Sequence, residues 1–137
     1  MSSFYTQILT PTGIAFEGEI ETVKIPGTEG GFEVNKGHAS LISLMDIGVA
    51  RIRKPQDKNE LTYAISGGFT EVNDDTVIIM AEAAEEKKQI DVDRAKRAKE
   101  RAEQRLQEKD KKGADLSVQR AEMALKRAAN RIKVSEL

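Results

Sequence analysis

The stretch that decides the fold is TVIIMAEAAEEKKQIDVDRAKRAKE, from Thr76 to Glu100. Its first residues are apolar or β-branched and predict a buried strand, whereas the residues after the IDVD segment are strong helix formers. No glycine or proline occurs from there until Gly113. The stretch therefore joins a β-rich domain, expected over residues 1–84, to a helical domain, expected over residues 85–137.

Upstream of this junction, short apolar or alternating runs are separated by residues that favour turns. The candidate strands are FYTQIL, IAFEGEI, ETVKI, GFEV, SLISL, GVARIR, LTYAIS, GFTEV and TVIIMA. Strands that follow one another so closely, without a helical period between them, predict an antiparallel β-sandwich or barrel. The glycines of SGGF, Gly67 and Gly68, indicate a bulge or a close backbone approach within it.

Downstream of the junction, apolar side chains recur at spacings of three and four residues, as on one face of an α-helix. The first set is Ala95, Ala98, Ala102 and Leu106, and the second is Val118, Ala121, Leu125, Ala128 and Ile132. Gly113 can end the first helix and Asp115 can cap the second, which predicts a two-helix hairpin.

The two apolar stripes consist mostly of alanine, and burial of one methyl-sized group contributes only about 0.8 kcal/mol. The hairpin is therefore expected to be held weakly. Two alternatives remain open: a hairpin that stays permanently closed, and one that opens and offers the same faces to another protein as a switch.

Charge is distributed unevenly along the chain. From Met1 to Ala84, 6 Lys and Arg oppose 12 Asp and Glu, a net charge of −6; from Glu85 to Leu137, 16 oppose 11, a net charge of +5. A basic segment of this kind indicates an acidic protein, a nucleotide or a nucleic acid as partner. Nucleic acid is disfavoured, because acidic residues interrupt the basic ones and the segment has no aromatic side chain to stack on a base.

The sequence offers little material for catalysis. It has no cysteine and one histidine, His38, in the turn-like NKGHA, so neither a zinc cluster nor a Ser-His-Asp triad is expected. Neither GxxxxGK[ST] nor GxGxxG is present. The run from Val77 to Ala81 is far too short to span a membrane, and the N-terminus lacks the features of a signal peptide. We therefore expect a protein that is not an enzyme and does not insert into the membrane directly.

The segment IDVDRA begins the first predicted helix. Asp91 is an ordinary N-cap, but Arg94 lies in the first turn, where positive charge is unfavourable. When the hairpin folds back, Arg94 comes level with Arg131, and Arg127 lies one turn below. Three guanidinium groups beside a helix N-terminus suit phosphate oxygens, while Asp91 can accept hydrogen bonds from a base or ribose. The alternative is three solvated arginines on a charged surface.

Taken together, these segments resemble the epsilon subunit of bacterial and chloroplast-type rotary ATP synthases along essentially the whole chain. The resemblance is carried by LTPTG, TVKIPGTEGGFEVNKGHASLIS, SGGFTEV, TVIIMAEAAE, IDVDRA and RAEMALKRAANRIKV. It implies a ten-stranded sandwich followed by two helices, in a non-catalytic rotor subunit that binds the gamma subunit and the c-ring. It also implies that the subunit lies peripherally at the cytoplasmic face of the cell membrane, as part of the ATP synthase complex. The helices are implied to extend into the alpha/beta head and inhibit ATP hydrolysis.

In Bacillus-like members of this family, the closed hairpin binds ATP as a regulatory ligand. The I-D-x-x-R-A motif corresponds to Ile90, Asp91 and Arg94 of this chain, followed by an alanine. The two arginines of the last helix correspond to Arg127 and Arg131, and Glu85 falls where such members carry a further acidic contact. The resemblance thus implies an ATP site made of Glu85, Ile90, Asp91, Arg94, Arg127 and Arg131, with the role of magnesium left open. A purely structural coupling subunit without nucleotide sensing is the alternative.

The chain departs from the family pattern in the NKGH loop. Lys36 and Ser40 stand where the family often has prolines, and the segment GFEVN replaces a commoner leucine-glycine-isoleucine sequence. The resemblance therefore leaves the shape of this loop open and assigns no individual contact with the c-ring.

Overall fold

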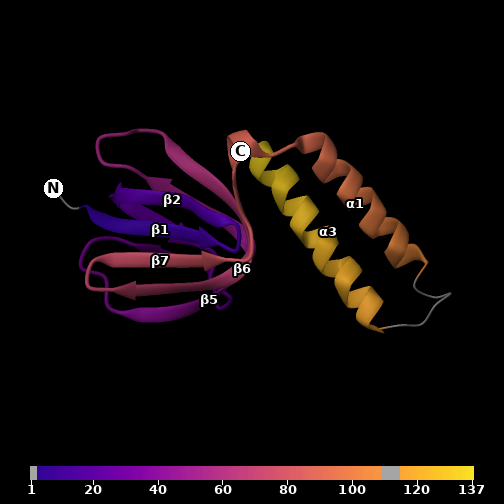
Figure 1. The fold of residues 1–137 in the computed structure, drawn as a ribbon, viewed down its shortest axis with the longest axis horizontal. Helices are drawn as coiled ribbons and strands as arrows, with labels where there is room; N and C mark the ends of the chain where they lie inside the picture. The colour runs from indigo at the N-terminus through magenta and orange to yellow at the C-terminus, as the bar shows by residue number, and fades with distance from the viewer. Residues whose placement is uncertain (1–2, 109–114) are drawn as a thin grey trace. The chain divides into compact units, whose positions relative to one another are not determined.

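The computed structural model describes residues 3–108 and 115–137 (Figure 1). The chain divides into two compact units, Met1–Lys87 and Lys88–Leu137, the first built from strands and the second from helices. Strand β8 (Ala84–Glu86) pairs with β6, so the residues just after the expected domain boundary belong to the β unit.

The first unit is one continuous, folded-over sheet. Its strands are β1 (Phe4–Thr10), β2 (Gly13–Ile20), β3 (Thr22–Ile25), β4 (Phe32–Val34), β5 (Leu41–Arg53), β6 (Glu60–Asn73), β7 (Thr76–Ala81) and β8. They pair in the order β2-β1-β7-β6-β5-β3-β4, and β8 pairs with β6. The expected antiparallel arrangement holds for every strand pair of the described residues except β1 with β7, which is parallel. These two strands lie far apart in the sequence, so no tight turn forces them to be antiparallel.

The expected count of ten strands is wrong when each continuous strand is counted once, because the described residues form eight strands. SLISL and GVARIR are parts of one strand, β5, and LTYAIS and GFTEV are parts of β6. The first half of β5 pairs with the second half of β6, which in turn pairs with β7. The second half of β5 pairs with the first half of β6, and these two halves also pair with β3 and β8 respectively. Because β5 and β6 each contribute to both layers, five strand segments lie in each layer of the sandwich.

The long strands change layer at the glycine pair. Gly67 and Gly68 have φ angles of 91° and 124°, which favour glycine. A Cβ atom on Gly68 would collide with the backbone of Met80 and Ala81, so the close backbone approach predicted from SGGF is confirmed. Opposite this point, Asp46 donates its backbone N–H to the carbonyl of Pro26 at 2.9 Å.

Large aliphatic side chains from both layers fill the core of the sandwich. The largest fully buried ones are Ile8, Ile20, Ile25, Ile52, Ile65 and Ile79. Burial of each such side chain contributes about 1.5–3 kcal/mol, so this unit has a substantial core although the chain has few aromatic residues.

The second unit is the expected hairpin. A 3-10 turn, η1 (Lys87–Gln89), leads into α1 (Val92–Gln107), and α3 (Asp115–Ser135) returns beside it in the opposite direction (Figure 1). Among the side chains of the two helices whose burial the structure describes, the buried ones are Ala95, Ala102, Ala121, Ala128 and Val134. We call these residues the alanine seam. The helix end predicted at Gly113 and the cap predicted from the side chain of Asp115 lie outside the described residues.

No helix within the described parts of the chain is both long and apolar enough to cross a membrane.

Candidate functional site

The predicted nucleotide site begins at the N-terminus of α1. Asp91 is the N-cap, as predicted: its Oδ1 accepts a hydrogen bond from the backbone N–H of Arg94 at 3.0 Å, and its carbonyl accepts one from Ala95 at 3.0 Å. The cap satisfies one of the N–H groups that a helix leaves without an internal partner. The side chain of Arg94 is exposed in the first turn, beside the remaining N–H groups.

Two of the three apolar residues of the IDVDRA segment, the first and the last, are buried. Ile90 is 9% exposed and Ala95 is 1% exposed. Packing therefore accounts for the isoleucine and the alanine, and Asp91 and Arg94 are the polar side chains that the motif offers to a ligand.

Arg127 and Arg131 lie one turn apart on the last part of α3, and both are half-buried. Positive charge near a helix C-terminus is favourable. Because α3 runs antiparallel to α1, its end lies beside the beginning of α1 (Figure 1). The hairpin thus carries both arginines toward the same end as Asp91 and Arg94.

Glu85 differs from the other predicted site residues. It lies in β8, where it is half-buried and opposite Ala64 of β6, and it belongs to the β unit. The fold therefore gathers Asp91, Arg94, Arg127 and Arg131 at one end of the hairpin, and it holds Glu85 in the sheet. In the described residues, no group of three or more His, Cys, Asp or Glu side chains could hold a metal ion.

Sequence reasoning missed a second candidate site, on the outer face of the layer that contains β1 and β7. Directly paired residues on five neighbouring strands carry large apolar side chains. They are Ile14, Leu9, Met80, Phe69 and Leu44, from β2, β1, β7, β6 and β5 respectively. We call these five residues the apolar row.

The apolar row is exposed. Leu44 is 64% exposed, Ile14 56%, Met80 42% and Phe69 39%. A contiguous apolar surface of this kind marks a site of interaction with another molecule. The sequence held a signal for it: Val77 and Ile79 face the core, so the alternation of a strand turns Met80 outward.

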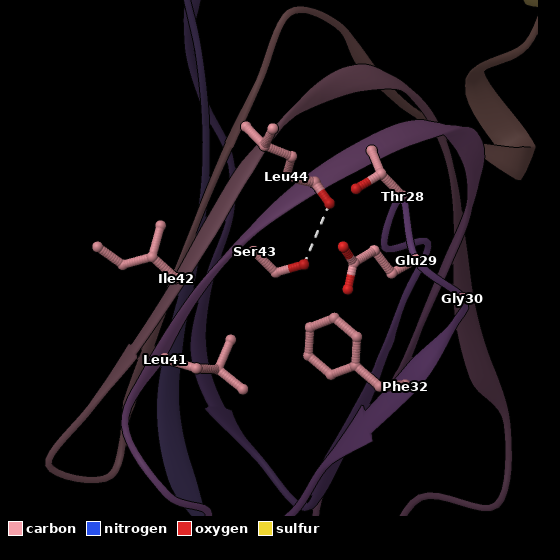
Figure 2. A pocket seen from close by; sticks show the side chains of 8 residues that line it. All are labelled: Thr28, Glu29, Gly30, Phe32, Leu41, Ile42, Ser43 and Leu44. Carbon is pink, nitrogen blue, oxygen red and sulfur yellow. Dashed lines mark hydrogen bonds between the residues drawn. The ribbon is translucent and has the colours of Figure 1, made fainter.

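A pocket of about 400 Å³ opens between the segment before β4 and the first part of β5 (Figure 2). Figure 2 shows the carboxylate of Glu29 above the ring of Phe32, with the Ser43 hydroxyl donating to the carbonyl of Leu44 at 3.1 Å. A carboxylate beside an aromatic ring can hold a cationic side chain of a partner.

The NKGH loop is fastened to the turn between β6 and β7. The backbone N–H of Gly37 donates to Oδ1 of Asp75 at 2.9 Å, and the Ser40 hydroxyl donates to Oδ1 of Asn73 at 3.4 Å. His38 Nδ1 lies 2.7 Å from the carbonyl of the next residue, which fixes the ring within the loop. The hydrogen bonds of Gly37 and Ser40 thus hold this loop against the turn between β6 and β7.

Both units match known family models. Residues 3–87 match the model described as "ATP synthase, Delta/Epsilon chain, beta-sandwich domain". Residues 88–136 match the model described as "ATP synthase, Delta/Epsilon chain, long alpha-helix domain".

Curated relatives are similar along nearly their whole length. The ATP synthase epsilon chain of Desulforamulus reducens is 43% identical over 129 residues, which cover 94% of each chain. The epsilon chain of an Exiguobacterium species is 41% identical over 137 residues, covering 100% of this chain and 98% of the relative.

Two solved structures share the fold. One is the mitochondrial ATP synthase OSCP/F1/c-ring of Euglena gracilis, with a TM-score of 0.79 at 22% identity over 93% of this chain and 78% of that chain. The other is the mitochondrial ATP synthase central stalk and c-ring of Tetrahymena thermophila, with a TM-score of 0.66 at 14% identity over 96% and 95%.

Proposed function

Because the chain belongs to the ATP synthase delta/epsilon family, we propose that its two C-terminal helices inhibit ATP hydrolysis by the complex and that ATP holds them in the closed hairpin. The chain is an epsilon subunit of the central stalk and is not itself catalytic. Its proposed partners are the gamma subunit, the c-ring and the alpha/beta head, at the cytoplasmic face of the membrane. Both similar solved structures are named as assemblies that include a c-ring, which supports that partner.

The alanine seam is the observation that carries the regulatory part of this proposal. Four of its five side chains are single methyl groups, each contributing about 0.8 kcal/mol on burial. A ligand present at 100 times its Kd adds roughly 2.7 kcal/mol to the state that it binds. A bound nucleotide can therefore add to the closed hairpin a stabilisation comparable to that of the buried alanine methyl groups of the seam.

The end of the hairpin supplies the chemistry that such a ligand needs. The free N–H groups at the start of α1 and the guanidinium of Arg94 favour phosphate oxygens, and Arg127 and Arg131 approach from α3. When ATP leaves, the +5 charge of residues 85–137 suits an acidic surface of the catalytic head.

Calorimetric titration of the full chain with ATP tests the site. The double variant Arg94→Ala/Arg131→Ala is expected to bind ATP at least about tenfold more weakly, because two charge-assisted contacts to phosphate are lost. Arg97→Ala/Arg101→Ala, which removes two exposed arginines from the middle of α1, is the matched control and should bind as the wild type does. Equal binding by both double variants would remove the site.

ATP hydrolysis by the assembled complex tests inhibition. With the full chain, hydrolysis is expected to be suppressed at low ATP concentration and to recover as ATP rises. With a chain that ends at Ile90, it should be uninhibited at every ATP concentration. If the chain is instead a purely structural coupling subunit, hydrolysis should respond to ATP concentration in the same way with the full chain and with the truncated chain.

A further inference from the structure

Seven arginines of the hairpin form one row on each helix. On α1 they recur at spacings of three and four residues, and on α3 at spacings of seven and four, so each row stays on one side of its helix. The rows are Arg94, Arg97, Arg101 and Arg105 on α1, and Arg120, Arg127 and Arg131 on α3.

The two rows come to the same face of the closed hairpin. At 3.6 residues per turn, each row lies roughly 110° around its helix from the alanine seam, and the sense of rotation is the same in both helices. Because α1 and α3 run antiparallel and pack through this seam, equal rotations in the same sense bring both rows to one face. We call this surface, made of the seven arginines, the arginine face.

The opposite face carries the other charged residues of the same stretches. Between the first and last arginine of each row, every lysine and every acidic residue lies on that opposite face. They are Lys96, Lys99, Glu100, Glu103, Glu122 and Lys126. Within residues 3–108 and 115–137, no carboxylate forms an ion pair with Arg97, Arg101 or Arg105, and all three side chains are exposed. The arginine face is therefore suited to an anionic ligand.

The proposed ATP site accounts for only one end of the arginine face. Its arginines, Arg94, Arg127 and Arg131, lie where α1 begins and α3 ends. At 1.5 Å per residue, the row on α1 continues from Arg94 for about 16 Å, to Arg105. A triphosphate is too short to reach the far end of this row, so a longer anion is needed to use the whole face.

The chemistry of the face favours a chain of phosphates among long anions. Guanidinium groups donate paired hydrogen bonds to phosphate oxygens. Every unit of a phosphate chain carries such oxygens, whereas an extended acidic peptide turns alternate side chains away from the surface that it covers. Nucleic acid is disfavoured, because residues 85–137 contain no aromatic side chain to stack on a base.

We propose that the arginine face of the closed hairpin binds a linear chain of more than three phosphates. One end of the chain occupies the proposed ATP site, on which this inference rests, and the remainder reaches Arg101, Arg105 and Arg120. Because α1 and α3 supply one row each, such a chain competes with ATP and, like ATP, holds the hairpin closed. Inorganic polyphosphate and a nucleotide with a longer phosphate tail share this chemistry.

Calorimetric titration of the full chain with long-chain inorganic polyphosphate, tripolyphosphate and ATP, at one ionic strength, tests the proposal. Arg101→Ala/Arg105→Ala is expected to bind the long chain at least about tenfold more weakly than the wild type, because charge-assisted contacts are lost. The same variant should bind tripolyphosphate and ATP as the wild type does. Lys96→Ala/Lys99→Ala removes the same charge from exposed positions on the opposite face and is the matched control. It should bind the long chain as the wild type does.

Further titrations test the two-row arrangement and the identity of the ligand. Arg120→Ala should also weaken binding of the long chain, since this arginine lies level with Arg105 on the other helix. Adenosine tetraphosphate distinguishes the two sources of the phosphate chain: tighter binding than ATP, with the gain lost in Arg97→Ala, would identify a nucleotide. Unchanged affinity relative to ATP, together with tight binding of polyphosphate, would identify the inorganic chain.

Several results would overturn the inference. Equal losses in the arginine and lysine double variants would show that only net charge matters. Binding of the long chain without displacement of ATP would exclude a shared end, and equally tight binding of polyglutamate would assign the face to an acidic protein. Each of these results leaves the ATP site intact. Failure of the wild-type chain to bind ATP would instead refute the proposed function.

Discussion

The β-sandwich and the helical hairpin of this chain are stabilised by side chains of very different size. The sandwich buries isoleucines and valines such as Ile8, Ile79 and Val77 at 0% exposure, whereas the hairpin buries mainly alanines. Each large aliphatic side chain contributes about 1.5–3 kcal/mol on burial, against about 0.8 kcal/mol for a methyl group. The core of the sandwich thus contributes more free energy per buried side chain than the alanine seam does.

The backbone hydrogen bonds show the same contrast. In the sandwich they join strands that are distant in the sequence, such as β1 and β7, so unfolding must break them. In the hairpin the backbone hydrogen bonds lie within each helix, and separating α1 from α3 leaves them intact. Separating the two helices would therefore cost side-chain contacts between α1 and α3, those of the alanine seam among them, and no backbone hydrogen bond within either helix.

The largest expected effect is in the core of the sandwich. Ile79→Ala should lower the free energy of unfolding by about 2–5 kcal/mol, because it removes buried methyl groups and leaves a cavity. Urea denaturation of the full chain measures the change. Ile78→Ala, at the neighbouring half-buried position, is the control and should cost clearly less. Equal losses at the two positions would contradict the alternation of core and surface in β7.

A smaller effect is expected at the seam of the hairpin. Ala128 is 0% exposed, and Ala128→Leu should disfavour the closed form by about 1–3 kcal/mol through overpacking. Ala129→Leu places the same side chain at an exposed position of the same helix and should leave closure unchanged.

Spin labels can measure the distance between α1 and α3. The chain has no cysteine of its own, so labels attach only at introduced cysteines. Labels at Glu100→Cys and Glu122→Cys, both exposed, should report a longer and broader distance between α1 and α3 in Ala128→Leu. Identical distances in Ala128→Leu and Ala129→Leu would show that the seam does not control closure.

The smallest effect is expected at the helix cap. Asp91→Ala should destabilise the start of α1 by about 1 kcal/mol, because the N–H of Arg94 loses its partner. Faster amide exchange in the first turn of α1, with exchange in β7 unchanged, would show it. Asp91→Asn keeps a capping oxygen and should restore protection. If Asp91→Asn also binds ATP as the wild type does, the carboxylate acts as a cap and its charge is not needed by the ligand.

Local features of this fold were accessible from the sequence. The cap at Asp91 and the helical spacing of Ala95 and Ala102 each depend on residues within a few positions of one another. The glycine at position 68 indicated a close backbone approach, but only the structure shows that Met80 and Ala81 make it. The positions of the residues of the predicted ATP site could be deduced from the sequence only in part. Its residues on α1 and α3 follow from helix periodicity, but the placement of Glu85 in β8 depends on pairing with a distant strand.

The sequence by itself determined that a β-rich unit is followed by two alanine-faced helices, because alternation, helical period and turn chemistry are properties of neighbouring residues. Only the tertiary structure decided that β5 and β6 run through both layers, that β1 lies parallel to β7, and that Leu44, Phe69 and Met80 meet in one exposed row. Strand order and register are set by which distant segments bury their apolar faces together, and that choice is made by the whole core at once.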